Sequence, residues 1–186
     1  MPSCVSWTGL LPSAWAAHTL PSFVYTRDGN VWAAHADGSS PVQLTQDGTP
    51  QTPYESPSQS DDGTVLAVRG SRFATFDRAG HATRSFGSVL TGKPGAVNAY
   101  GPWDAKLSPD GRTIAYWLGI MGGWHDYSTG TYYSDPESAV VFQSAVDGRQ
   151  LGDTMFYEQP SWASDSQHVL IFDELNALTP LSLIHI

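Results

Sequence analysis

The nine residues Ser108-Pro109-Asp110-Gly111-Arg112-Thr113-Ile114-Ala115-Tyr116 decide the fold. Glycine accepts a positive φ without a Cβ clash, and an aspartate carboxylate caps the turn before it, so Asp110-Gly111 ahead of an apolar run is typical of a β-hairpin. The run that follows is rich in β-branched and aromatic residues, which predicts a strand. The stretch therefore predicts a turn at 110–111 followed by a strand.

The same pattern recurs on both sides of this stretch. Residues 58–68 read SQSDDGTVLAV, and residues 161–172 read SWASDSQHVLIF. The turn aspartates Asp62, Asp110 and Asp165 are 48 and 55 residues apart. A second strand, turn and strand follow each run. Three or four strands in a period of about 40–50 residues are typical of one blade of a β-propeller.

Helices have little room in this chain because 18 Gly and 13 Pro interrupt it. Before Ser161, the longest stretch without either residue is 137–147. A typical helix needs about 11–12 residues. The spacing therefore predicts an all-β chain of antiparallel hairpins.

Residues 108–116, together with 28–32 and 37–45, resemble the TolB-type, WD-repeat-like β-propeller repeat. The resemblance covers about residues 22–174 in three repeats, of which the middle one is nearly a consensus match. Elsewhere the chain departs from the family: Gln59 and Asp61 stand where the family favours Trp and Pro, and Ser166 replaces the turn Gly. The resemblance implies a scaffold with partners at its faces or central channel. From the residues alone, an unrelated antiparallel sandwich is the alternative.

We therefore expect a partial β-propeller of about three to four antiparallel blades over residues 17–179. Because a ring needs roughly 4–8 blades, this reads as a fragment of a six- to eight-bladed ring. Residues 1–16 resemble a shortened signal peptide, since Ala14-Trp15-Ala16 fits the small-x-small pattern before a cleavage site; a disordered leader is the alternative. Residues 180–186 do not continue the repeat and resemble a translated sequencing-adapter tail. The alternative there is a native strand.

Charge and composition exclude several classes of protein. The chain has 9 Lys+Arg against 18 Asp+Glu and a net charge of −9, which argues against a nucleic-acid partner. No apolar run approaches the 18 residues of a membrane-spanning segment. Cys4 is the single cysteine, so the chain has no internal disulfide and no thiolate zinc cluster.

No sequence motif points to catalysis. The six histidines never fall at metal-ligand spacing, and there is no His-Glu-x-x-His helix, Gly-x-Ser-x-Gly elbow, P-loop or GxGxxG fingerprint. We interpret acidic pairs such as Asp61-Asp62 as turn caps. The sequence thus predicts no enzyme activity, no cofactor and no bound metal.

One connection, residues 119–138, is much longer than the others. Loops longer than about 12–15 residues are usually functional or disordered, and the aromatic content here disfavours disorder. Its aromatic and hydrogen-bonding side chains are the predicted binding residues: Trp124, His125, Asp126, Tyr127, Tyr132 and Tyr133. The alternative is that these aromatics fold back onto a neighbouring blade or extend a hairpin.

The favoured function is a non-catalytic, extracytoplasmic (periplasmic or secreted) scaffold that binds a protein or peptide; a cytoplasmic location stays open. One alternative is the propeller of a prolyl-oligopeptidase-like serine peptidase, in which the resemblance implies a catalytic Ser, Asp and His in a hydrolase domain outside this chain. The other is a glycan-binding propeller, because aromatic loops suit stacking on sugars.

Overall fold

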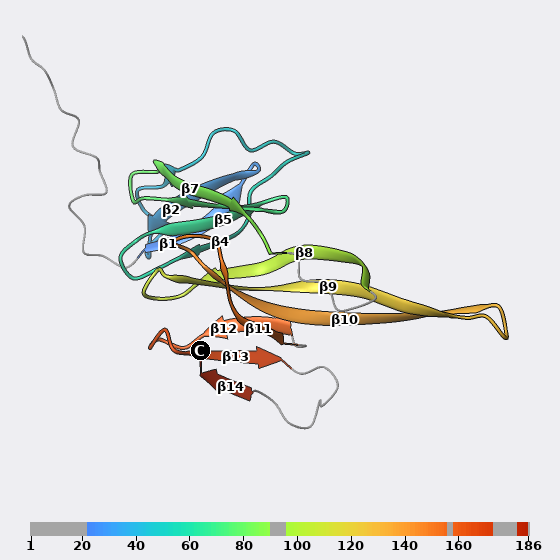
Figure 1. Ribbon diagram of the computed structural model, residues 1–186. Helices are drawn as coiled ribbons and strands as arrows, with labels where there is room; N and C mark the ends of the chain where they lie inside the picture. The colour runs from blue at the N-terminus through green and yellow to red at the C-terminus, as the bar shows by residue number, and fades with distance from the viewer. Residues whose placement is uncertain (1–21, 90–95, 156–157, 173–181, 186) are drawn as a thin grey trace, which may run out of the picture.

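The computed structural model describes residues 22–89, 96–155, 158–172 and 182–185, and these ranges contain strands but no helix (Figure 1). The strands are β1 (Ser22–Arg27), β2 (Asn30–His35), β3 (Val42–Gln43), β4 (Glu55–Gln59), β5 (Val65–Arg69), β6 (Arg72–Phe76), β7 (Ala82–Gly87), β8 (Ala96–Leu107), β9 (Thr113–Asp126), β10 (Thr131–Ser144), β11 (Gln150–Met155), β12 (Glu158–Trp162), β13 (His168–Phe172) and β14 (Ser182–His185). The prediction of an all-β chain is confirmed. Among the described residues, no helix has the length and apolar character needed to cross a membrane.

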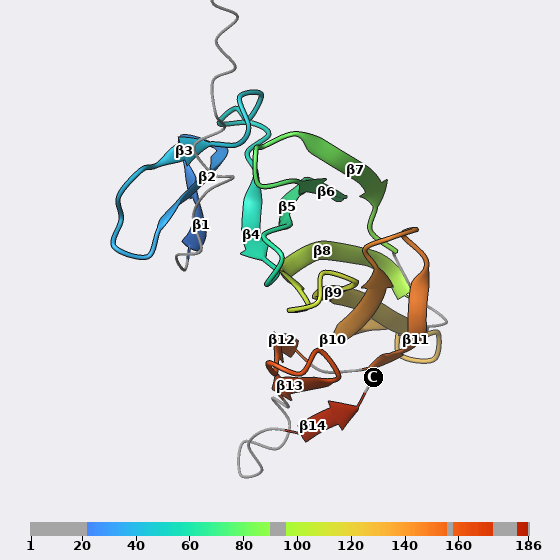
Figure 2. The ribbon, with the colours of Figure 1, turned by 90° about the vertical axis from the view of Figure 1, so that its left-hand side faces the viewer.

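The strands form four consecutive antiparallel sheets in chain order. Sheet 1 is β1-β2-β3, sheet 2 is β4-β5-β6-β7, sheet 3 is β8-β9-β10-β11 and sheet 4 is β12-β13-β14. The first strand of each sheet lies beside the first strand of the next, so that β1, β4, β8 and β12 follow one another. Figure 2 shows the sheets along an arc, which does not close into a ring in the described part of the chain.

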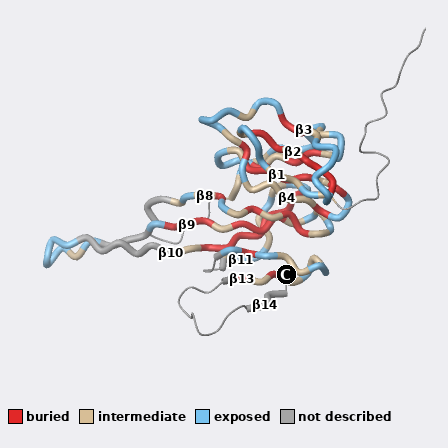
Figure 3. The backbone as a smooth tube through the Cα atoms, turned by 180° about the vertical axis from the view of Figure 1, so that it is seen from behind, coloured by how far each residue is buried: buried red, intermediate tan, exposed pale blue. Residues whose placement is uncertain are grey.

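A separate apolar core lies between each pair of consecutive sheets. Val31 and Val65 belong to the core between sheets 1 and 2, Leu66 and Ile114 to the next, and Val169 to the core between sheets 3 and 4. Neighbouring side chains of one strand point to opposite cores, so the middle strands are buried on both faces (Figure 3). This is why their sequences are continuous apolar runs rather than an alternation of apolar and polar residues.

The repeated turns form as the sequence predicts. Gly63 and Gly111 have φ of +86° and +74°, and the equivalent Ser166 has φ of +60°. The turns also connect the sheets. The Asp61 amide donates to the Pro109 carbonyl at 2.8 Å, and the Asp110 amide donates to Ser166 Oγ at 3.0 Å.

The two ends of the chain differ in what the structure describes. The predicted leader, 1–16, lies outside the described residues. Near the other end, β14 pairs with β13, with Val169 opposite Ile184, as the third strand of sheet 4. The interpretation of residues 180–186 as an adapter tail stays a prediction, because strand pairing does not test the origin of the segment.

Candidate functional site

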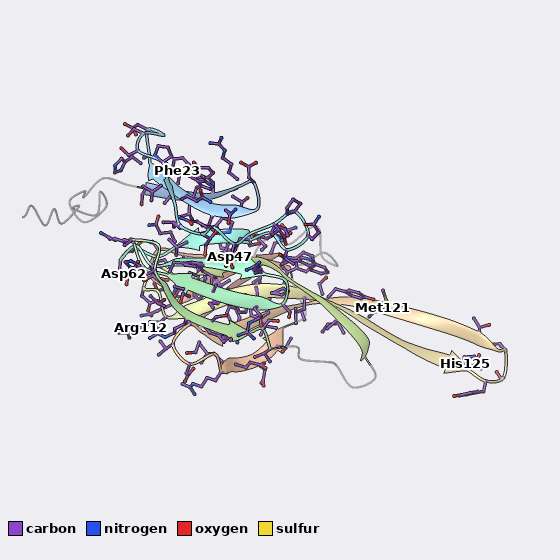
Figure 4. The ribbon with its side chains drawn as sticks, turned by 90° about the horizontal axis from the view of Figure 1, so that it is seen from above. Phe23, Asp47, Asp62, Arg112, Met121 and His125 are labelled. Carbon is purple, nitrogen blue, oxygen red and sulfur yellow. The ribbon has the colours of Figure 1, made fainter. Side chains whose placement is uncertain are left out.

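The long connection after Leu118 is an extended hairpin. Strands β9 and β10 pair along their whole length, from Thr113 opposite Ser144 to Asp126 opposite Thr131. Strand β8 pairs with β9 only as far as Gly122, and β11 pairs with β10 only from Val140. Residues 123–134, here called the arm, therefore form a two-stranded ribbon that projects from the sheets (Figures 1 and 4).

The prediction of an irregular loop at 119–138 is thus wrong, and the alternative of an extended hairpin is what the structure shows. Gly122, Gly123 and Pro136 are poor strand formers and suggested a loop. Proline is tolerated at strand edges, where its missing N–H leaves no ladder bond unmade. Pro136 lies opposite Met121, at a point where β10 has no second neighbour in the described sheet.

A turn at residues 127–130 closes the arm, with Gly130 at φ +68°. Asp126 Oδ1 accepts hydrogen bonds from the Ser128 hydroxyl at 2.7 Å and the Ser128 amide at 2.9 Å. These bonds hold the pKa of the Asp126 carboxyl below its ordinary value. The rings of His125 and Tyr127 lie 4.7 Å apart, and Tyr127 is 90% exposed. The tip thus has a fixed turn and an exposed ring.

The register brings the predicted binding positions together at the end of the arm. Tyr132 lies opposite His125, and Tyr133 lies opposite Trp124. Directly opposite residues of an antiparallel pair share a face of the ribbon. For Trp124, Tyr132 and Tyr133 the structure describes the backbone pairing alone. That these residues bind a partner stays a prediction.

The structure also contains a groove at the first strands of sheets 2, 3 and 4, which sequence reasoning missed. This inner groove, about 330 Å³, is lined by residues of β4, β8 and β12. Leu107 N donates to Ser58 Oγ at 2.8 Å, and Trp162 Nε1 donates to the Lys106 carbonyl at 3.0 Å. Lys106 Nζ lies 2.9 Å from Asp104 Oδ2, so these two charged groups of the groove form an ion pair.

A repeated backbone feature shapes the inner groove. Ser56, Asp104 and Gln159 have φ of +46°, +47° and +50°, and each stands six residues before a turn aspartate. Each also lies at a register shift of its strand. A bulge bends the strand locally and redirects its side chains. The six-residue spacing was visible in the sequence, but no glycine marked these positions.

A second hollow, the outer groove, lies on the outer strands of sheet 2 and has a volume of about 500 Å³. Its lining includes Tyr54, Phe76, Arg69, Arg72 and Arg84. No part of the sequence analysis singled out these residues, because they come from four separate segments. Within the described residues, no group of three or more His, Cys, Asp or Glu side chains is placed to hold a metal ion.

Comparison with known proteins gives a distant likeness. No protein-family model matches the chain, and no curated protein matches it. Among solved structures, the chain is similar to one in "Crystal Structure of Mitotic Checkpoint Complex", at 13% identity and a TM-score of 0.36. The match covers 82% of this chain and 67% of that chain. A likeness this distant says nothing of function, and the fold rests on the strand pairing described above.

Proposed function

We propose that this chain is a non-catalytic repeat module of the β-propeller type that binds a protein or peptide, with the arm as its recognition element. The observation that carries the proposal is a two-stranded arm that leaves the sheets and ends in the exposed pair His125 and Tyr127. A two-stranded hairpin is marginally stable in water, and an exposed ring buries no apolar surface. Stability of the fold therefore does not account for the arm.

Aromatic residues on a β-ribbon suit recognition of protein. Trp and Tyr offer large contact areas at little entropic cost and are enriched in binding hot spots. Within the described residues, the outer edge of β10 from Thr131 to Glu137 has no neighbouring strand. Such an edge offers backbone N–H and C=O groups to an added strand. This edge favours an extended peptide over a glycan, which has no backbone to match it.

The proposal assigns no catalytic role. Supporting this, the sequence contains no nucleophile elbow or metalloprotease motif, and the turn carboxylates Asp62 and Asp165 already accept hydrogen bonds from their own turns. We also propose an extracytoplasmic location, which rests on Ala14-Trp15-Ala16 alone. N-terminal sequencing of the exported chain tests it, with cleavage after Ala16 as the expected result.

The test of arm recognition starts with peptides selected from a random display library against the 186-residue chain. Their Kd is then measured for the chain, for the variant Trp124→Ala/Tyr132→Ala and for Tyr127→Ala. The control is Tyr100→Ala, a residue of β8 that is 50% exposed and lies outside the arm. We expect the arm variants to weaken binding at least tenfold, with melting temperatures and the control's affinity unchanged.

Two outcomes contradict arm recognition. If the Trp124→Ala/Tyr132→Ala variant melts much lower while binding per folded molecule is unchanged, these aromatics belong to a core. If no peptide is enriched and a glycan array gives arm-dependent binding instead, the partner class is a glycan.

A further inference from the structure

The outer groove exists because sheets 1 and 2 have unequal widths. Within the described residues, sheet 1 has three strands, and its third, β3, is two residues long, whereas sheet 2 has four strands. Tyr54, Ala74 and Phe76 belong to the core between these two sheets and also line the groove. The groove therefore lies at the outer end of that core. There, no described strand of sheet 1 covers β6 and β7.

One wall of the outer groove consists of Asp47, Tyr54 and Arg69, which hydrogen bonds and an ion pair hold together and whose charges cancel. The Tyr54 hydroxyl donates to Asp47 Oδ1 at 3.1 Å. Arg69 forms an ion pair with the Asp47 carboxylate and donates to the Asp47 carbonyl at 2.7 Å. Its guanidinium lies 5.2 Å from the centre of the Tyr54 ring. Below them, the rings of Tyr54 and Phe76 meet edge to face at 6.0 Å, which gives the groove an aromatic floor.

The rim of the groove carries positive charge that no described carboxylate neutralises. Arg72 lies directly opposite Arg69 across β5 and β6, an arrangement of like charges that is destabilising by itself. Asp47 compensates Arg69, whereas no described carboxylate forms an ion pair with Arg72 or Arg84. The side chain of Arg72 instead donates to Ser85 Oγ at 3.3 Å. In a chain of net charge −9, this is a local positive site.

We propose that the outer groove binds a small organic anion that has a planar apolar body and one carboxylate. A volume of about 500 Å³ lies within the range of about 300–1,000 Å³ typical of small-molecule sites. The body of the ligand packs against Tyr54, Ala74 and Phe76. Its carboxylate pairs with Arg72, which shares the face of β6 that carries Ala74 and Phe76, since a guanidinium matches a carboxylate in shape as well as in charge. This site is independent of the arm: Figure 4 shows Asp47 among the sheets and His125 at the far end of the hairpin.

The test titrates the 186-residue chain with naphthalene-2-carboxylate and with the uncharged naphthalene-2-carboxamide, following ligand fluorescence. The variant Arg72→Gln removes the rim charge. The control Arg149→Gln removes the same charge at an exposed arginine outside the groove, which pairs with Asp147. We expect the carboxylate to bind at least tenfold tighter than the amide, to lose at least tenfold in the groove variant and to change less than twofold in the control.

A third variant, Ala74→Leu, fills the floor without changing charge and is expected to weaken binding of both probes. Circular dichroism establishes that each variant is folded at the temperature of titration, and the floor and rim variants test the site independently. Equal affinity for acid and amide, equal losses in the two arginine variants, full binding by Ala74→Leu or the absence of saturable binding would each overturn the proposal. Removal of the arm leaves carboxylate binding unchanged, so failure of this site and failure of arm recognition are distinguishable.

Discussion

At each repeated turn, the aspartate side chain folds back onto the residues that follow it. Asp62 Oδ1 accepts from the Thr64 amide at 2.9 Å, and Asp110 Oδ1 accepts from the Arg112 amide at 3.1 Å. Asp165 Oδ1 accepts from the amides of Gln167 and His168. These contacts satisfy backbone donors that the turn would otherwise leave unpaired. The prediction of a turn cap is confirmed for Asp62, whereas the structure gives the Asp61 carboxylate no such contact among the described residues.

Gly111 tests the turn directly. A Cβ added there would make ordinary contact with Ser60 Oγ at 3.4 Å, so the obstacle is the φ of +74° rather than space. We expect Gly111→Val to lower the free energy of unfolding by about 1–3 kcal/mol, measured by urea denaturation. Gly87→Val is the matched control, because Gly87 lies in a strand with open space around its Cα. Equal effects of the two substitutions would contradict the turn argument.

Asp165 makes stability depend on pH. Hydrogen bonds from the backbone of Gln167, the first cause, and from His168 lower its pKa from about 4 to about 2. Because the folded pKa lies below the unfolded one, the stabilisation is complete above about pH 4 and is lost as the pH falls toward 2. In urea titrations, the stability difference between the chain and Asp165→Asn is therefore expected to shrink from pH 6 to pH 2. A difference that stays constant over this range would show that the charge of Asp165 is not the cause.

Strands β9 and β10 form one hairpin with two parts that differ in packing. Near its base, Ile114, Tyr116 and Val141 are fully buried between sheets 2 and 3. Beyond Gly122 the same strands pair with each other alone. Burial of each large side chain in the base stabilises the fold by about 1.5–3 kcal/mol. The arm makes no such contribution to the cores.

Removal of the arm tests this division. Replacing residues 123–134 with Asn-Gly joins Gly122 to Asp135, which already lie opposite each other, through a dipeptide that favours tight hairpins. We expect the free energy of unfolding to change by less than about 1 kcal/mol, equivalent to about 2–4 °C in melting temperature. Calorimetry measures the shift. A much larger fall would mean that the arm packs against the sheets.

A buried polar network joins sheets 2 and 3. The Tyr116 hydroxyl donates to Gln143 Oε1 at 2.9 Å and accepts from the Val89 amide at 2.9 Å. Gln143 Nε2 donates to the carbonyls of Gly87 and Gly148, at 2.9 and 2.7 Å. Burial raises the pKa of the Tyr116 hydroxyl well above its ordinary value, so it stays a neutral donor.

Removing one hydroxyl is expected to disrupt this network. In Tyr116→Phe, Gln143 Oε1 and the Val89 backbone lose a buried partner, which costs about 1–3 kcal/mol of stability. Tyr127→Phe, at the exposed tip of the arm, is the matched control and should leave the urea midpoint unchanged. A loss of equal size in both variants would exclude the network as the cause.

At the scale of the whole molecule, each sheet packs against the sheets that precede and follow it in the chain. Each of the three cores joins two consecutive sheets, and sheets 2 and 3 each contribute to two of them. In such arrangements stability is approximately the sum of the contributions of each unit and of the interfaces between neighbours. Sheets 2 and 3, which have neighbours on both sides, should therefore be the most stable part.

Hydrogen exchange measured by mass spectrometry tests this order. We expect the slowest amide exchange in β5 and in the base of β9 and β10, and faster exchange in β1 and the arm. The expectation follows from burial: Leu66, Ala115 and Val140 are completely buried, whereas Phe23 is 43% exposed. Arm amides as protected as those of β5 would contradict a free-standing ribbon.

The sequence by itself determined the turns, most of the strands and their succession as repeats. These features are local: Asp110-Gly111 sets its own backbone geometry, and the apolar run after it needs only the nearest strands to pair. The same reasoning located the predicted binding residues on one segment. The prediction that this segment is a loop was wrong. Gly122, Gly123 and Pro136 count against a strand as long as the strand that pairs with them is not known.

Tertiary structure alone decided the rest. Gln143 is polar yet fully buried, because the Tyr116 hydroxyl and the carbonyls of Gly87 and Gly148 form hydrogen bonds with it. Arg69 and Arg72 look alike in sequence, but Asp47 reaches only the first. Both grooves are lined by segments far apart along the chain. Such contacts form between residues that are distant in sequence and that the packing of the sheets brings within a few ångströms of each other. A local sequence pattern does not contain this information.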